Sequence, residues 1–404
     1  MSVVTRAPAP AAAGLFDQLE PQPADSLLAL IGLHRADPRP GKIDLGVGIY
    51  RDAAGVTPIM RAVKAAESLL VGTQSTKAYL GPEGDPRFTA LLAPIVLGQA
   101  LGASDRLTGV QTPGGTGALR LGADLLARAG MTGRVWIGTP TWPNHGPIFA
   151  AAGLSVAPHP FYDAASSTLD FESMVRALAA ARAGDVVLLH GCCHNPTGTG
   201  FSRAQWKALA SDFVVRGIVP FIDLAYQGLG DGMEEDAAGL RLMLDAVPEA
   251  LVAYSCDKNF GLYRERVGAL WTLSASAAGV AAVRENLLVL ARSLWSMPPD
   301  HGAAVVRAIL EDEALAMIWR DELEEMRVRI GALRAALASA DPRLAPIATQ
   351  RGLFAILPVT PPAVIALRER HGIYMAGSGR INIAGLTTKT IAPFVAALAP
   401  FLPE

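Results

Sequence analysis

The feature that most constrains the fold is an alternation of short apolar runs with helix-like stretches, which is clear from residue 135 onward. Four of the runs are VWIG (135–138), VVLLH (186–190), VPFIDLAY (219–226) and LVAYS (251–255). Runs of this length fit buried strands, and strands that alternate with helices build a largely parallel sheet with crossover helices. The sequence therefore predicts an α/β fold.

Polar side chains collect just beyond the ends of these predicted strands. They are Trp142, Asn144 and His145; His194 and Asn195; Asp223 and Tyr226; Ser255 and Lys258. In open α/β sheets, ligands bind outside the carboxyl ends of the strands. Four such clusters are hard to explain as packing, so we expect a binding site along this edge.

Lys258 is the candidate for amine chemistry. The chain has six lysines, and the other five lie in helix-like or polar surroundings that indicate solvated surface. A lysine is costly to bury, and a desolvated amine with a lowered pKa can form a Schiff base. The simpler interpretation, a lysine that only marks a strand end, would be favoured if this stretch stood alone.

Asp223 lies inside an apolar predicted strand. An unpaired carboxylate there would cost several kcal/mol and would tend to be neutral. A cationic partner such as a protonated ring nitrogen resolves this, whereas hydrogen bonds to nearby hydroxyls are the alternative. His145 and His194 carry less information, because a lone histidine is more often structural than catalytic.

Two further segments offer anion-binding groups. The glycines of TPGGTGALR (112–120) precede a predicted helix, where backbone N–H groups and the helix dipole favour a phosphate. The segment is not a Walker loop, and a plain tight turn is an equal alternative. In SGRINIAG (378–385), the fork of Arg380 suits a carboxylate, although a surface charge is the ordinary interpretation.

Composition excludes several classes of protein. A formal net charge of −2 gives no global attraction to nucleic acid or to an anionic membrane, and no apolar run reaches the roughly 18 residues that span a bilayer. The three cysteines, two of them adjacent, fit a reducing compartment and lack the spacing of a zinc site. We expect a cytoplasmic protein without a bound metal.

Taken together, the motifs TPGGTGALR, PTWPNH, HGCCHNPTG, DLAYQG, KNFGLYRERVG and SGRINIAG resemble those of the class I, fold-type I pyridoxal-phosphate aminotransferases, in the aspartate/aromatic branch. The resemblance extends from about residue 20 to 400. It implies a large domain with a mostly parallel seven-stranded sheet and a smaller α+β domain built from both termini. The implied parts are a flexible tail (1–19), the start of the small domain (20–47), the large domain (48–314), and the rest of the small domain (315–404), which opens with a long connecting helix (312–340).

The resemblance also implies a role for each matched residue. Lys258 would carry pyridoxal 5'-phosphate covalently and move the substrate proton, Asp223 would pair with the ring nitrogen with support from His145, and Tyr226 would complete the catalytic group. Other implied cofactor contacts are Trp142 on the ring, Asn195 and Tyr226 at the phenolic oxygen, and Gly115, Thr116, Ser255, Arg266 and a partner subunit's Tyr79 at the phosphate. Implied substrate contacts are Arg380, helped by Asn195 and Gly48, at the α-carboxylate, and a partner subunit's Arg292 at a distal carboxylate. Trp142 is also an implied substrate-binding residue. Sites shared in this way imply a homodimer.

One residue departs from the family pattern. Asp257 precedes the lysine at a position where the family commonly has serine near the phosphate. A carboxylate there should repel a phosphate dianion and weaken cofactor binding. It could instead point away, or pair with Arg264 or Arg266, and the sequence leaves these alternatives open.

The resemblance implies an enzyme that moves amino groups between aromatic amino acids or aspartate and 2-oxoglutarate by a ping-pong mechanism. The positions expected to border the side-chain pocket, Ile49, Ala78 and Met297, are apolar and favour aromatic substrates. Two alternatives stay open. One is a strict aspartate aminotransferase, and the other is a cofactor-binding protein with little or no catalysis, such as a regulator.

Overall fold

The computed structural model of the chain describes residues 14–22 and 26–403. Its centre is a seven-stranded sheet in which β10 runs antiparallel to both of its neighbours while the other pairs are parallel. The strands in spatial order are β2 (Leu107–Pro113), β10 (Val267–Leu273), β9 (Ala250–Ser255), β8 (Val219–Leu224), β7 (Val186–His190), β3 (Arg134–Thr139) and β4 (Ser155–Pro160). The predicted α/β fold with a mostly parallel sheet is confirmed.

Both faces of the sheet are covered, which explains why its strands are continuously apolar. Along β9, Leu251 and Ala253 face one core while Val252 and Tyr254 face the other. The helices packed on the first face are α5 (Gly114–Arg128), α6 (His145–Ala151) and α10 (Ala277–Leu294). The helices on the second face are α3 (Pro86–Leu97), α8 (Arg203–Arg216), α9 (Met233–Ala246) and α11 (His301–Glu311). The shorter elements of this part are α4 (Gln99–Gly102), β5 (Tyr162–Asp163), β6 (Thr168–Leu169) and α7 (Phe171–Leu178).

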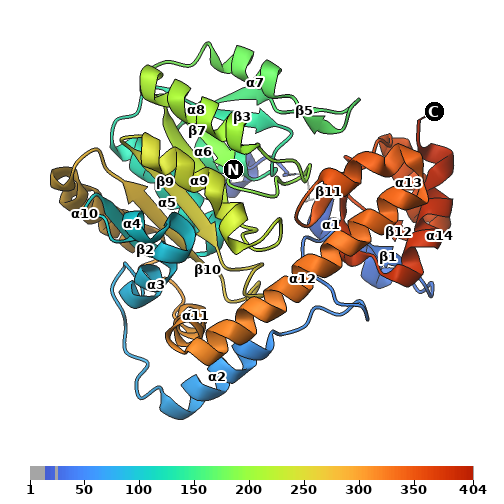
Figure 1. The fold of residues 1–404 in the computed structure, drawn as a ribbon, viewed down its shortest axis with the longest axis horizontal. Helices are drawn as coiled ribbons and strands as arrows, with labels where there is room; N and C mark the ends of the chain where they lie inside the picture. The colour runs from blue at the N-terminus through green and yellow to red at the C-terminus, as the bar shows by residue number, and fades with distance from the viewer. Residues whose placement is uncertain (1–13, 23–25, 404) are drawn as a thin grey trace, which may run out of the picture.

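A second group of elements is built from both ends of the chain, to the right in Figure 1. Two small sheets join them: β1 pairs with β12 in parallel, and β11 pairs with β13 in antiparallel. The elements are α1 (Ser26–Ala36), β1 (Ile43–Asp44), β11 (Phe354–Ile356), α13 (Pro361–His371), β12 (Ile373–Tyr374), β13 (Arg380–Asn382) and α14 (Thr388–Leu398). This arrangement confirms a smaller α+β part from both termini.

One long helix, α12 (Glu313–Ala340), links the two parts. Its first half packs against α11 and α2 (Arg61–Thr73), and its second half reaches the C-terminal group. The predicted connecting helix over residues 312–340 is confirmed to within one residue at its start. The exact domain boundaries stay a prediction.

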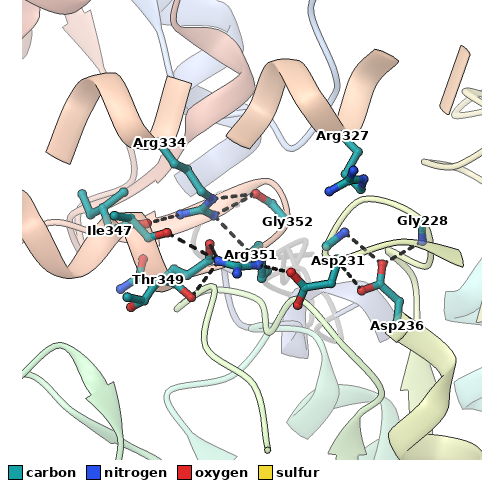
Figure 2. A network of polar contacts seen from close by, with 12 residues as sticks. Gly228, Asp231, Asp236, Arg327, Arg334, Ile347, Thr349, Arg351 and Gly352 are labelled. Carbon is teal, nitrogen blue, oxygen red and sulfur yellow. Dashed lines mark hydrogen bonds and ion pairs between the residues drawn. The ribbon is translucent and has the colours of Figure 1, made fainter. Parts of the chain in front are cut away.

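Polar contacts join the C-terminal part to the sheet-containing part beside α12 (Figure 2). From α12, the buried guanidinium of Arg334 donates hydrogen bonds to the carbonyls of Gly352 (2.8 Å) and Phe354 (2.6 Å). The neighbouring Arg351 reaches Asp231 in the loop after β8, with 2.5 Å between Nε and Oδ1. The segment before β11 is thus fastened to α12 and to the sheet-containing part.

Two expectations need qualification. Most of the predicted flexible tail, residues 1–13, lies outside the described residues. The glycines expected to form a loop before a helix belong to the helix itself, because α5 begins at Gly114. In the described part of the chain, no helix is both long enough and apolar enough to cross a membrane.

Candidate active site

A cavity of about 200 Å³ lies at the carboxyl ends of β7, β8 and β9. The three strands are parallel neighbours, so the segments that follow them leave from one edge of the sheet. Nine of the predicted site residues line the cavity: Gly115, Thr116, Trp142, Asn195, Asp223, Tyr226, Ser255, Lys258 and Arg266. The structure therefore brings these polar residues together at the strand ends, as the sequence predicted.

A second cavity of about 190 Å³ shares four of these residues, Trp142, Asn195, Tyr226 and Lys258. Its other side is formed by segments of the C-terminal part and by Gly48. The two cavities thus meet at Lys258, which follows the last buried strand of the parallel set.

Lys258 has the environment expected of a reactive amine. Burial lowers the pKa of its ammonium, and the carboxylates of Asp257 and Asp223 oppose this shift. One-fifth of the side chain stays exposed, and its Nζ lies 5.6 Å from the centre of the Tyr226 ring. An amine that releases its proton readily and faces a cavity can act as a nucleophile and as a base.

Asp223 lies in β8 and ends a chain of hydrogen bonds. Its Oδ2 lies 3.0 Å from Nε2 of His145, whose Nδ1 lies 2.8 Å from the hydroxyl of Thr141. Burial alone would raise the pKa of Asp223, but the hydrogen bond and the nearby positive charges lower it below its usual value. Asp223 is therefore an oriented anion in a buried site, suited to a cationic partner.

The start of α5 is suited to bind an anion, in contrast to the anionic Asp223, because backbone N–H groups gather there. Gly114 has a φ of 69°, and a Cβ atom there would lie 2.6 Å from Nη2 of Arg266. At Gly115 a Cβ atom would lie 3.1 Å from Cβ of Ser255. Glycine thus lets the helix start approach Ser255 and Arg266, which creates an anion cradle.

Asp257 belongs to the same cradle. The residue is 4% exposed, and its Oδ2 accepts a hydrogen bond of 2.5 Å from Nη1 of Arg266. Of the alternatives left open by the sequence, pairing with Arg266 is the one that the structure has.

Arg380 lies in β13 at the wall of the second cavity and is 5% exposed. Its Nη2 donates to the carbonyl of Gly46 (2.8 Å), and its guanidinium lies 4.5 Å from the centre of the Phe354 ring. Asn195 Oδ1 lies 3.4 Å from Nη1. A Cβ atom on Gly48 would lie 2.5 Å from the same phenyl ring, so glycine is required there.

The predicted partner-dependent residues lie outside both cavities. Tyr79 is 93% exposed, and Arg292 is also exposed, with its Nη1 on the hydroxyl of Ser296. The expected apolar rim residues Ile49, Ala78 and Met297 do not line either cavity of the single chain.

Sequence reasoning missed several contributors. Thr141 orients His145, and Phe354 packs below Arg380. His190, the last residue of β7, lines the first cavity, and burial together with His145 lowers its pKa to about 3. Its place at a strand end was a usable signal, whereas a threonine and a phenylalanine carry none.

Two groups of side chains in the described residues have a geometry that a metal could use. They are His145, His190 and Asp223, and Cys192, Cys193 and Asp236. In the first group, His145 and Asp223 already bond to each other. In the second, both oxygens of Asp236 accept backbone N–H groups of Gly228, Gly230 and Asp231 (Figure 2). The bonded atoms of His145, Asp223 and Asp236 therefore already have hydrogen-bond partners.

The site therefore combines an amine with a lowered pKa, a buried carboxylate, an anion cradle and a buried arginine. The sequence profile of the family "Aminotransferase class I and II" matches residues 40–398. The chain belongs to this family. The aminotransferase assignment drawn from the sequence motifs is confirmed.

Similar proteins agree with the family. The chain is 55% identical over 382 residues to a tyrosine aminotransferase of Rhizobium meliloti (strain 1021), covering 94% of this chain and 98% of that protein. It is 44% identical over 396 residues to the aspartate aminotransferase of Escherichia coli (strain K12), covering 96% and 100%. An aromatic-amino-acid aminotransferase from Burkholderia pseudomallei, solved covalently bound to pyridoxal phosphate, superposes with a TM-score of 0.93 at 38% identity, covering 97% and 100%.

The residues of this aminotransferase fit pyridoxal 5'-phosphate. The aldehyde requires an amine, the ring nitrogen an anion, and the phosphate a cradle of donors. Lys258, Asp223 and the start of α5 supply these within one cavity. The chemistry of the donor set thus matches the three functional ends of the cofactor.

Proposed function

We propose that this aminotransferase moves amino groups between aromatic amino acids or aspartate and 2-oxoglutarate, with pyridoxal 5'-phosphate held at Lys258. The observation that carries the proposal is the placement of Lys258 in one cavity with Asp223 and Arg266. The cofactor, when bound, supplies an electron sink that makes the Cα proton of an amino acid acidic. The two half-reactions then use the same site in turn.

Each residue of the site has a separate task in this proposal. Lys258 binds the cofactor and afterwards takes the proton from the substrate Cα, for which a lowered pKa is an advantage. Asp223, oriented by His145, holds the proton on the ring nitrogen. Asn195 and Tyr226 bind the phenolic oxygen, and Trp142 covers the ring.

The anion cradle binds the phosphate through Gly115, Thr116, Ser255 and Arg266. Substrate orientation depends on Arg380, whose guanidinium binds the α-carboxylate by a two-pronged hydrogen bond. Asn195 and Gly48 hold the guanidinium of Arg380 in place. Asn195 contacts it directly, and Gly48 leaves room for the Phe354 ring that packs against it.

The similar proteins support two kinds of amino donor. One is a tyrosine aminotransferase and another an aspartate aminotransferase. Ile49, Ala78 and Met297 do not reach the cavities of the single chain. As an apolar rim of the site in the proposed dimer they would favour an aromatic ring, since burying about 150 Å² of apolar surface yields at most roughly 4 kcal/mol. Arg292 of a partner subunit would meet a distal carboxylate. We therefore propose dual specificity that favours aromatic substrates.

The absorption spectrum of the purified protein tests catalysis directly. An amino acid should change the visible band of the bound cofactor, and 2-oxoglutarate should restore it. A protein that binds the cofactor without catalysis would show the first band and no change.

Substrate choice is tested by comparing kcat/KM for phenylalanine, tyrosine and aspartate. Arg292→Leu should lower aspartate turnover far more than phenylalanine turnover, while Arg284→Leu on the same helix should lower neither. An aspartate preference of about a thousandfold over both aromatic substrates, roughly 4 kcal/mol, would rule out dual specificity. Equal losses in Arg292→Leu would remove its assigned role.

We further propose a cytoplasmic homodimer whose partner supplies Tyr79 and Arg292. The exposed positions of these two residues, away from the cavities of their own chain, support a shared site. The free cysteines support a reducing compartment. Light scattering should give a dimer. Co-expression of Lys258→Ala and Arg292→Leu chains should restore aspartate turnover, because one site of each mixed dimer regains both residues.

A further inference from the structure

Asp257 places a buried carboxylate where the cavity is otherwise built to hold an anion. Its Oδ2 is occupied by Arg266 Nη1 at 2.5 Å, with Lys258 Nζ 3.9 Å away. Its Oδ1 is buried and forms no hydrogen bond with any residue that the structure describes. Leaving a buried carboxylate oxygen without a donor is unfavourable, so a bound group is expected to supply one.

Asp257 lies beside two cations, and one of them is already paired with it. Arg266 offers one positive charge that Asp257 already neutralises, and Lys258 is the other cation beside it. Those residues of α5 that line the cavity, namely Gly115, Thr116 and Leu119, are uncharged. Burial raises the pKa of nearby Tyr263 to about 12, so its phenol stays neutral.

A phosphate dianion is a poor neighbour for such a carboxylate. Both groups only accept hydrogen bonds, and both are negative. A phosphate that carries one proton has an O–H group, which can donate to the unoccupied Oδ1. The second pKa of a phosphate monoester is roughly 6, so the dianion is the main form in neutral solution.

We propose that Asp257 and the phosphate of pyridoxal phosphate share one proton, so that binding the cofactor at neutral pH takes up one proton. The proton comes from solvent and lies between Oδ1 and a phosphate oxygen, and no bond of the phosphate is broken. This inference rests on the proposed function, because it requires pyridoxal phosphate in this cavity. It makes cofactor affinity pH-dependent through one named residue.

The consequence follows from proton linkage. Each pH unit above the phosphate pKa of roughly 6 should weaken cofactor binding about tenfold through this proton. Other groups, including Lys258, add their own pH dependence. A variant without the carboxyl group keeps those contributions and loses this one, so the ratio of the two dissociation constants isolates Asp257.

The test compares full-length holoenzyme with Asp257→Ser and Asp257→Asn. Each protein is dialysed to equilibrium against graded pyridoxal phosphate between about pH 6.5 and 8.5, and bound cofactor is read by absorbance. The dissociation constant of the natural protein divided by that of either variant should rise about tenfold per pH unit, or about a hundredfold over the range. Asn is the closer control, because its amide keeps an acceptor for Arg266 and offers a donor to the phosphate.

A ratio that stays constant with pH overturns the proposal, whether the variants bind more tightly or more weakly. Equal melting temperatures and elution volumes confirm that the variants are folded. If no form binds pyridoxal phosphate, the proposed function fails together with this inference. If all bind it and respond to an amino acid while the ratio stays constant, this inference alone is wrong.

Discussion

Two buried aspartates face the same cavity, and they are satisfied in different ways. Asp223 is held by a chain of hydrogen bonds through His145 and Thr141, and no arginine or lysine of the described residues is hydrogen-bonded to it. Asp257 is paired directly with Arg266, and its other oxygen receives no hydrogen bond from the part of the chain that the structure describes. The Asp223 end of the site is therefore suited to bind a cation. The Asp257 end already contains a cation, Arg266, and is suited to accept a proton. A buried carboxylate alone therefore does not indicate which ligand group a site binds. The partner that the carboxylate already has within the protein must also be known.

Lys258 is influenced by both aspartates, since the carboxylates of Asp257 and Asp223 both raise the pKa of its ammonium. Lys258→Ala should abolish transamination while leaving a folded dimer, and both ends should still bind the cofactor without a covalent link. Steady-state turnover and cofactor retention on gel filtration measure the two effects. Lys207→Ala, at an exposed position, is the control. Turnover near that of the natural protein in Lys258→Ala would refute the assignment.

The sharpest test of the comparison replaces each carboxylate by its amide. Asp223→Asn should lower kcat on the order of 10²- to 10³-fold, because an uncompensated cation then remains in a buried site. Asp257→Asn should lower it far less. Rapid-reaction kinetics with saturating cofactor separates this effect from weaker binding. Similar losses in both variants would mean that the two ends do not differ as described.

Removing Arg266 should leave the carboxylate of Asp257 without its ion-pair partner. Arg266→Ala should weaken cofactor binding on the order of 10- to 100-fold, since it loses charged hydrogen bonds. Adding Asp257→Ala should recover part of that loss, because repulsion of the phosphate disappears. Equilibrium dialysis of the four proteins in the double-mutant cycle measures the coupling. Strict additivity would show that Asp257 and Arg266 act independently.

The smallest effect is expected at the far end of the Asp223 chain. Thr141→Val removes the hydroxyl bonded to His145 and should cost about 1 kcal/mol, or roughly fivefold in kcat. Thr141→Ser keeps the hydroxyl and should restore the rate. A loss in both variants would indicate a packing role for the threonine.

Much of this site could be predicted from the sequence, because strands, their ends and polar interruptions leave local patterns. Lys258 and Asp223 stand out against apolar neighbours, and the helix at Glu313–Ala340 has clear periodicity. The start of α5 was placed too late, since glycines disfavour helix and here form its first turn because of close packing.

Long-range pairing left no such pattern. The sequence could not choose between Arg264 and Arg266 as the partner of Asp257, because the choice depends on how the chain turns after β9. It also gave no sign of the buried role of Arg334, since arginine is common in this chain and usually solvated. Residues assigned to a partner subunit are a further case, because a single chain does not bring Tyr79 or Arg292 to the cavity.

The hydrogen bonds of Arg334 couple the position of α12 to the proposed substrate-binding residue Arg380. They fasten the backbone before β11 to α12, and β11 pairs with β13 so that Ile356 lies opposite Arg380. Helix α12, the β11–β13 pair and Arg380, which we propose to bind the substrate carboxylate, are thus connected in series. A helix of 28 residues is about 42 Å long, so a tilt of about 5° at its α2 end displaces the far end by about 4 Å. If α12, the β11–β13 pair and Arg380 move together, a small rotation near α2 would therefore carry Arg380 beyond hydrogen-bonding reach of the proposed substrate.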